Sequence, residues 1–194
     1  MPTSSFFVKH TFPLLLIVCL FCACAAESNP ALPLDPYIDP AGNFSFAIPQ
    51  GWQASELPEE SVLAFTPADY SGEITELRVL LFAAETDTFD TQEHLDQANA
   101  LLQPFLTKYL DDTFQVINQG ETEVAKSPAV LLDFAKPYGD LYLEGRLVMV
   151  AMPGYVLAFL GMGESEVWED FLPTFRTMLK EFQLLPQSED TPTL

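Results

Sequence analysis

The sequence predicts an α+β fold in which helices sandwich an antiparallel β-sheet. Segments with strand periodicity follow one another in runs instead of alternating strictly with helices, which is typical of antiparallel sheets. A Pro-Gly dipeptide at 153–154 joins two long apolar runs and predicts a tight hairpin turn. Apolar residues make up 48% of the 194 residues, enough to build a core around such a sheet.

Short strands open the domain. Residues 43–48 alternate polar and apolar side chains with the period of two that a half-buried strand has. The Pro-Gln-Gly sequence at 49–51 predicts a turn, and Trp52 begins the next strand. A third strand is expected at 62–66, and Pro67 ends it.

A long strand is expected at 74–84, after a turn at Ser71-Gly72. Leu80 and Phe82 make its second half apolar on both sides, so both faces of the sheet should be covered there. The expected core face carries Leu77, Val79, Leu81 and Ala83.

The first helix is expected at 91–110. Asp90 and Glu93 fit a capping box at its start. Its apolar residues recur at the spacing of a buried helix face. That stripe consists of Leu95, Ala98, Leu102, Phe105 and Tyr109.

Strands are expected again after this helix. One is expected at 113–118, followed by a polar turn at Gln119-Gly120 and a further strand at 129–134. Residues 141–151 and 155–162 are the two arms of the hairpin that the Pro-Gly turn joins.

The final helix is expected at 165–182, with Ser165 as its N-cap. Glu166 near its start and Lys180 near its end complement the helix dipole. Its buried face is wide and rich in aromatic side chains. The stripe consists of Trp168, Phe171, Leu172, Phe175, Leu179 and Phe182.

The N-terminus has the pattern of an export signal. Residues 11–26 carry no charge and would form about 24 Å of helix, which is short against a bilayer core of about 30 Å. The Phe-Cys-Ala-Cys run at 21–24 resembles a bacterial lipoprotein signal, in which the last Cys receives the lipid. We therefore expect lipidation at Cys24, and a plain cleaved signal peptide or an uncleaved anchor are the alternatives.

Four regions are expected along the chain. They are a lipoprotein-type signal peptide at 1–23, a Pro-rich tether at 24–38, one domain at 39–185 and a flexible tail at 186–194. The domain is expected to be monomeric and to lie on the extracytoplasmic face of a bacterial membrane, held by its N-terminal lipid. Without the lipid it would be secreted.

The charge of the chain excludes several classes of partner. Its 8 Lys and Arg against 28 Asp and Glu give a net charge of −20, which disfavours binding to nucleic acid and docking to anionic lipid surfaces. The expected partner is a protein, and a basic surface would complement the charge. All 3 cysteines lie at or before Cys24, so a disulfide scaffold is excluded.

A cluster of possible metal ligands lies at the start of the first helix. Asp87, Asp90, Glu93 and His94 offer carboxylates and one imidazole, which suit Ca²⁺, Mn²⁺ or Zn²⁺. The spacing matches no EF-hand and no second His follows, so a solvated helix start is the simpler interpretation. No cofactor is expected.

No motif of the sequence indicates an enzyme. There is no G-x-S-x-G sequence, and Cys is absent after Cys24. Gly161-Met162-Gly163 precedes a helix, as a phosphate-binding loop does, but no Gly-Lys-Ser/Thr follows it. We interpret this segment as the end of a strand.

The sequence resembles the PsbP-like domain family over about residues 37–185. Residues 37–52 are similar to the family's opening, with an Asp-Pro, a Gly, an aromatic strand and then Pro-x-Gly-Trp. Residues 119–129 are similar to the family's turn into its second half, although Lys126-Ser127 stands where a Gly commonly precedes the Pro-Ala step. The closing helix is similar too, through Phe175, Met178, Leu179 and Phe182.

This resemblance implies a PsbP-like α/β/α sandwich and a non-catalytic role. The family includes an extrinsic photosystem II subunit, a nuclear-transport protein that binds the GTPase Ran, and many bacterial lipoproteins. The main hypothesis is therefore a membrane-anchored extracytoplasmic lipoprotein with a binding or assembly role. One alternative is a metal-binding or small-ligand carrier, whose ligand needs an apolar cavity that Trp168 and Phe171 leave free. A metal-assisted hydrolase that uses the acidic cluster is the weakest alternative.

Overall fold

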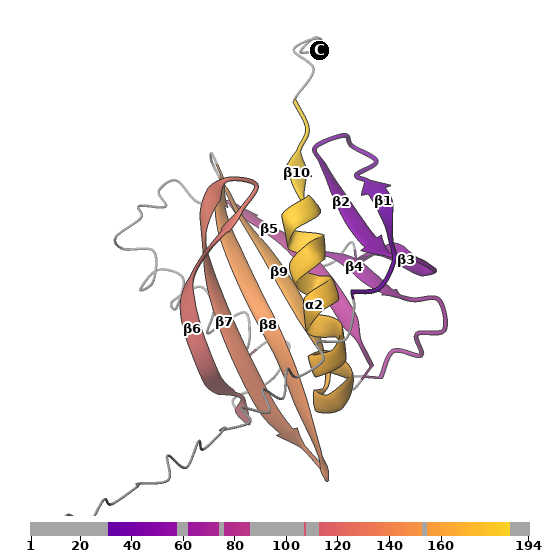
Figure 1. The fold of residues 1–194 in the computed structure, drawn as a ribbon, viewed down its shortest axis with the longest axis vertical. Coiled ribbons are helices and arrows are strands. Elements are labelled where there is room, and N and C mark those ends of the chain that lie inside the picture. The colour runs from indigo at the N-terminus through magenta and orange to yellow at the C-terminus, as the bar shows by residue number, and fades with distance from the viewer. Residues whose placement is uncertain are drawn as a thin grey trace, which may run out of the picture.

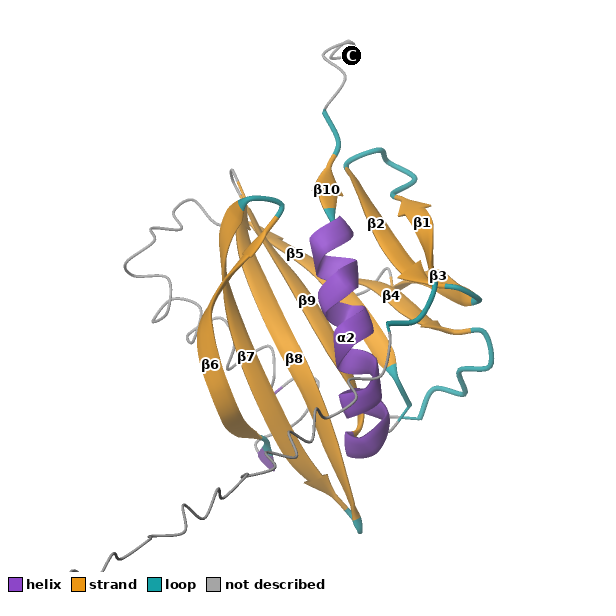
Figure 2. Cartoon of the chain, viewed as in Figure 1, coloured by secondary structure: helices purple, strands orange, loops and turns teal. Residues whose placement is uncertain are grey.

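Two β-sheets and one long helix make up the described part of the chain (Figure 1, Figure 2). The computed structural model describes residues 31–57, 62–73, 76–85, 107, 113–152 and 155–186. The elements are β1 (Leu34–Ile38), β2 (Phe44–Pro49), β3 (Trp52–Leu57), β4 (Val62–Pro67), β5 (Arg78–Glu85), β6 (Gln115–Val124), β7 (Ser127–Tyr138), β8 (Leu141–Met152), β9 (Tyr155–Glu164), α2 (Ser165–Glu181) and β10 (Gln183–Leu184).

The larger sheet has seven strands in the order β3-β4-β5-β9-β8-β7-β6, and every neighbouring pair is antiparallel. Strands β6 to β9 run as a meander that ends with β9 beside β5. Met152 pairs with Tyr155, which confirms the tight hairpin expected between the two long runs. The antiparallel sheet expected from the sequence is therefore confirmed.

Only one face of this sheet carries a helix among the described residues. Helix α2 packs against β8 and β9 of the large sheet and against β2 of the small one (Figure 1). The helix expected at 91–110 lies outside the described residues. Of the two helix layers expected on the sheet, the described residues thus support the one that α2 forms.

The central strands of the large sheet are nevertheless buried on both faces. On β5, Val79 and Leu81 belong to the core cluster under α2, whereas Leu80 and Phe82 belong to a second cluster on the opposite face. This confirms that the strand is covered on both sides. The side chains alternate because successive residues of a strand point to opposite faces.

The segment expected as a tether is part of the fold from residue 34 onward. Strand β1 pairs with β2 from Leu34 opposite Pro49 to Ile38 opposite Ser45. The Leu32 backbone N–H donates to Thr174 Oγ1 on α2 at 2.8 Å. The expected tether at 24–38 is therefore wrong for its last five residues, which form β1. A proline such as Pro36 is tolerated there because β1 is an edge strand.

Helix α2 begins as expected but is not capped as expected. Glu164 occupies the N-cap position, and no side chain bonds the free N–H groups there. The Ser165 hydroxyl donates instead to Glu144 Oε1 on β8 at 2.7 Å, so the expected Ser165 cap is wrong. The aromatic face is confirmed. Its buried members are Trp168, Phe171, Phe175, Met178, Leu179 and, just after the helix, Phe182, while Leu172 is half-buried.

The turn expected at Gln119-Gly120 is wrong. Both residues lie inside β6, opposite Leu132 and Leu131 of β7. Pairing of β6 with residues 127–135 of β7 outweighs the local turn preference of one glycine. The chain turns at Ala125-Lys126 instead.

Candidate functional site

A groove lies between α2 and the hairpin of β6 and β7. Helix α2 covers the middle of the sheet, and the strands beyond β8 extend past it (Figure 1). Two adjoining hollows of about 650 and 220 Å³ share Glu123, Leu179 and Lys180. We call this surface the α2–β6 groove. Its lining consists of Thr122, Glu123, Ala125, Lys126, Leu131, Arg146, Val148, Arg176, Leu179, Lys180, Phe182, Gln183 and Leu184.

The helix wall of the groove carries two cations. Arg176 and Lys180 are four residues apart, so they lie on the same side of α2. A like-charge pair at this spacing destabilises a helix by about 0.2–0.5 kcal/mol. Lys180 lies in the last turn, where a cation is favoured by the helix dipole. Both side chains are exposed.

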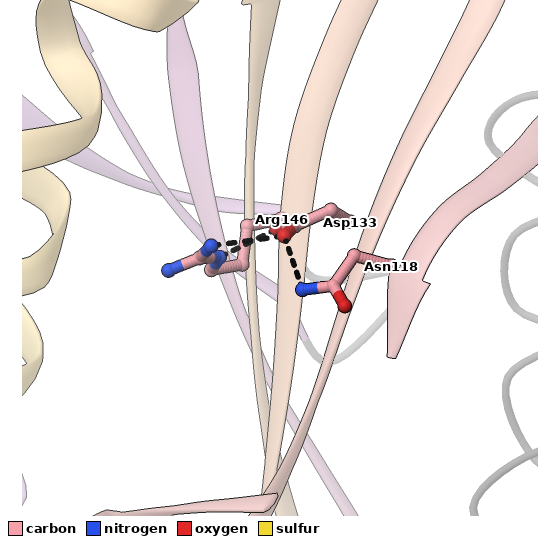
Figure 3. Close-up of polar contacts among 3 residues, drawn as sticks. All are labelled: Asn118, Asp133 and Arg146. Atoms are coloured by element: carbon pink, nitrogen blue, oxygen red, sulfur yellow. Dashed lines mark hydrogen bonds and ion pairs between the residues drawn. The ribbon is translucent and has the colours of Figure 1, made fainter. Parts of the chain in front are cut away.

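The sheet wall carries a fixed cation. Arg146 on β8 lies opposite Asp133 on β7, with Nε and Nη2 donating to the two carboxylate oxygens at 2.6 and 2.9 Å (Figure 3). Asn118 Nδ2 on β6 donates to the same carboxylate at 3.2 Å. The remaining guanidinium nitrogen points away from the carboxylate (Figure 3). This bidentate pair holds Arg146 in one geometry.

A fourth cation, Lys126, lies in a strained turn at the end of the groove. Ala125 and Lys126 link β6 to β7 with φ angles of 51° and 64°. Two positive φ angles in a two-residue hairpin are typical of a type I′ turn, which favours Asn-Gly. Non-glycine residues in this region cost about 1–2 kcal/mol each. Strain of this kind is often retained at functional sites.

The groove stands out against the charge of the whole chain, which is −20. In the part of the chain that the structure describes, the exposed cationic side chains are Lys126, Arg176 and Lys180, and all three line the groove. Of the other described cations, Arg146 lines the groove but is paired with Asp133. Lys136 is buried, and Arg78 is half-buried and donates to Tyr70 Oη at 2.9 Å.

The groove contains two carboxylates that partly offset its cations. Glu123 lines both hollows, and Asp133 is paired with Arg146. Apolar side chains lie between the charges, among them Leu131, Val148 and Leu179. The lining therefore combines positive charge with an apolar floor.

A third hollow, of about 320 Å³, lies apart from the groove at the start of α2 and is acidic. Asp69, Glu76 and Glu164 are among the residues that line it. The Ser71 hydroxyl and backbone N–H donate to Glu76 and lower the pKa of its carboxyl. Within the described ranges, no three Asp, Glu, His or Cys side chains are grouped as metal ligands would be.

The site residues expected from the sequence lie outside the described residues. This applies to Cys24 and to Asp87, Asp90, Glu93 and His94. Lipidation and the possible metal site therefore stay predictions. Calorimetric titration of the protein with Ca²⁺, Mn²⁺ and Zn²⁺ tests the metal site. If no heat of binding is measured, the metal site is excluded. In the part of the chain that is described, no helix is long and apolar enough to span a bilayer.

The space under α2 is filled. Trp168 and Phe171 are 3% and 2% exposed, and Trp52 stacks on Phe171 with ring centroids 5.1 Å apart and an interplanar angle of 6°. These side chains occupy the space that an apolar ligand would need. Gly161 lies within β9, with the Trp168 ring against it, which is consistent with the strand-end interpretation of residues 161–163.

Sequence reasoning missed the α2–β6 groove. Its walls come from β6, β8 and α2, which are brought together only by the sheet topology. The one local signal was the spacing of Arg176 and Lys180, which places two cations on the same side of the helix.

The protein, with its antiparallel seven-stranded sheet, long C-terminal helix and small second sheet, has the PsbP-like fold, which solved structures share. The protein is similar to cyanobacterial PsbP (CyanoP) from Synechocystis sp. PCC 6803, with a TM-score of 0.61 and 15% identity over 80% of this chain and 94% of that one. It is also similar to LpqN of Mycobacterium tuberculosis, with a TM-score of 0.58 and 13% identity over 79% and 86% of the two chains.

A third similar structure is the Ran-binding protein Mog1p of Saccharomyces cerevisiae. Its TM-score is 0.57, with 8% identity over 79% of this chain and 96% of that one. The sequence matches no family model and no curated protein sequence. The likeness to these three structures confirms the PsbP-like fold, at identities that establish the fold alone. The helix layer expected on both faces of the sheet is supported for α2 only.

Proposed function

We propose that the protein is a membrane-anchored extracytoplasmic lipoprotein with a non-catalytic binding or assembly role, and that the α2–β6 groove is its binding surface. One observation carries this proposal. The exposed cations of the described residues, Lys126, Arg176 and Lys180, gather in one groove of a chain with a net charge of −20.

The structural neighbours support a binding role and an envelope location. Mog1p is described as a Ran-binding protein, and LpqN as involved in cell envelope biogenesis. A protein with this fold therefore binds another protein in one case and serves the cell envelope in another. We extend both features to this chain as parts of the proposal.

The anchor is proposed to be a lipid on Cys24. The eight residues from 24 to 31 would then connect the membrane to the folded domain, over at most about 28 Å at about 3.5 Å per residue. The domain would stay near the membrane surface, and its net negative charge would keep it off anionic headgroups.

Labelling with radioactive palmitate in a bacterial host tests the anchor. The parent protein should incorporate label and fractionate with membranes, and Cys24→Ala should abolish both. Cys22→Ala is the matched control, because Cys22 is a neighbouring thiol that is not expected to receive the lipid. Retained labelling in Cys24→Ala would remove this part of the proposal.

Site-specific photo-crosslinking tests the groove. A benzoylphenylalanine at Thr122 is exposed and lines the groove, whereas one at Gln53 is exposed on the opposite edge strand β3. We expect a discrete protein adduct in living cells from position 122 and none from position 53. An adduct pattern that is the same at both positions, or no adduct at 122, would contradict the groove as the binding surface.

A further inference from the structure

We infer that the α2–β6 groove binds an acidic, partly apolar, extended segment of a protein partner. This inference rests on the proposed function and adds the chemistry of the partner. It reverses the expectation of a basic partner, which follows from the net charge of the chain. The local charge of the contact surface, and not the net charge, decides which segment it attracts.

The groove attracts negative charge at separate points. Lys126 lies on the β6–β7 turn, Arg176 and Lys180 lie on α2, and Arg146 lies on β8. The Asp133 carboxylate neutralises much of the charge of Arg146, and Glu123 offsets one further positive charge. The uncompensated cations are thus spread along the groove, which suits several carboxylates on one chain better than a single compact anion.

Apolar contacts lie between these cations. Leu131 and Val148 form part of the floor, Leu179 lies on the helix wall, and Leu184, 40% exposed, lies at the far end. A ligand that alternates carboxylates with apolar side chains would match this lining. An inorganic anion or a lipid headgroup would leave the apolar part of the lining unused.

An extended segment suits the strand at the outer wall. Strand β6 is an edge strand of the large sheet, and on its outer side no described strand pairs with it. An edge strand is the position at which a sheet can pair with an extended peptide.

A membrane surface is a poorer occupant than a protein segment. The domain as a whole is strongly acidic, so an anionic leaflet would repel it while attracting only the groove. A flexible acidic segment can enter the groove without bringing a charged plane against the rest of the domain. The inference therefore commits to a protein segment.

Peptide binding tests this inference. The full-length protein is placed in phosphatidylcholine nanodiscs, with empty nanodiscs as the blank. The probe is a fluorescein-labelled 12-residue peptide of alternating Glu and Leu. Its binding is measured by fluorescence anisotropy at two salt concentrations. We expect saturable binding that weakens with salt, because exposed charge pairs are screened.

A charge-matched pair of variants locates the site. Arg176→Gln/Lys180→Gln removes two exposed cations from the groove and should weaken binding about tenfold. Gln53→Glu/Ser55→Glu changes the net charge by the same amount on the exposed far edge and should leave binding within about twofold. Circular dichroism and urea midpoints establish that both variants are folded.

Three results would overturn the inference. They are equal binding of a peptide with Lys in place of Glu, equal loss in the two double variants, and binding to phosphatidylglycerol vesicles without binding to the acidic peptide. The photo-crosslinking at position 122 separates this failure from failure of the proposed function. An adduct that persists in Arg176→Gln/Lys180→Gln supports the groove while rejecting the acidic partner.

Discussion

The carboxylate of Asp133 and the guanidinium of Arg146 lie directly opposite each other on β7 and β8 and form two hydrogen bonds of 2.6 and 2.9 Å. The pair is partly buried, with 21% and 11% of the two side chains exposed. It has two effects. It joins the strands that form the sheet wall of the groove, and it neutralises a cation that would otherwise face the ligand.

The first prediction concerns this pair. Asp133→Asn removes the negative charge and frees Arg146, so the acidic peptide should bind about threefold more tightly. The free energy of unfolding should fall by about 1–2 kcal/mol, because a charged hydrogen-bonded pair is lost. Anisotropy and urea denaturation measure the two effects. Asn118→Ala is the control: it removes one bond to Asp133 but leaves Arg146 paired, so binding should not tighten.

The second prediction concerns the strained turn. Ala125→Asn/Lys126→Gly introduces the residues that a type I′ turn favours, so the protein should gain about 1–2 kcal/mol in stability. The same variant lacks one groove cation and should bind the acidic peptide two- to threefold more weakly. Ala125→Gly should also stabilise but leave binding unchanged. Loss of stability in both variants would show that the turn is not strained.

The third prediction concerns the contact of α2 with the sheet. A Cβ atom added to Gly161 would lie 2.6 Å from the Trp168 ring, which is fixed in the core. Gly161→Ala should therefore destabilise the protein by about 2–3 kcal/mol, as overpacked cores do. Gly120→Ala is the control, because its nearest neighbour would lie at 4.0 Å and an alanine is favoured over glycine in a strand. Equal urea midpoints for the two variants would contradict this packing.

The fourth prediction concerns alkaline pH. Burial raises the pKa of the Tyr37 phenol above 10.0, and the nearby carboxylates of Asp39 and Glu56 raise it further. The folded state thus holds the phenolic proton more tightly than the unfolded state. Stability from this group is present below pH 10 and is lost as the pH rises through the folded pKa. In Tyr37→Phe, the urea midpoint should decline less steeply above pH 10 than in the parent.

Local patterns were sufficient for much of the fold. The alternation in β5 predicted burial on both faces, and the spacing of Trp168, Phe171 and Phe175 predicted the buried face of α2. These features depend on side chains that are close in sequence. The hairpin of β8 and β9 has the same origin, because its turn and both arms are contiguous.

Features that depend on distant segments could not be predicted in this way. The Pro-rich sequence of β1 is typical of a tether, and only its pairing with β2 makes it part of the domain. The Ala125-Lys126 turn carries no Gly or Asn, so Gly120 gave a misleading signal. The groove requires β6, β8 and α2 to meet, which no local pattern encodes.

The most direct test of the α2–β6 groove as the binding surface is the change in backbone amide chemical shifts when the Glu-Leu peptide is added to the isotope-labelled protein. We expect the shifts to be confined to the groove, at residues 122–126, 131, 146–148 and 176–184. They should be absent in Arg176→Gln/Lys180→Gln at the same peptide concentration. Shifts centred on β3 and β4 or on the β7–β8 turn, or no shifts at saturating peptide, would contradict the account.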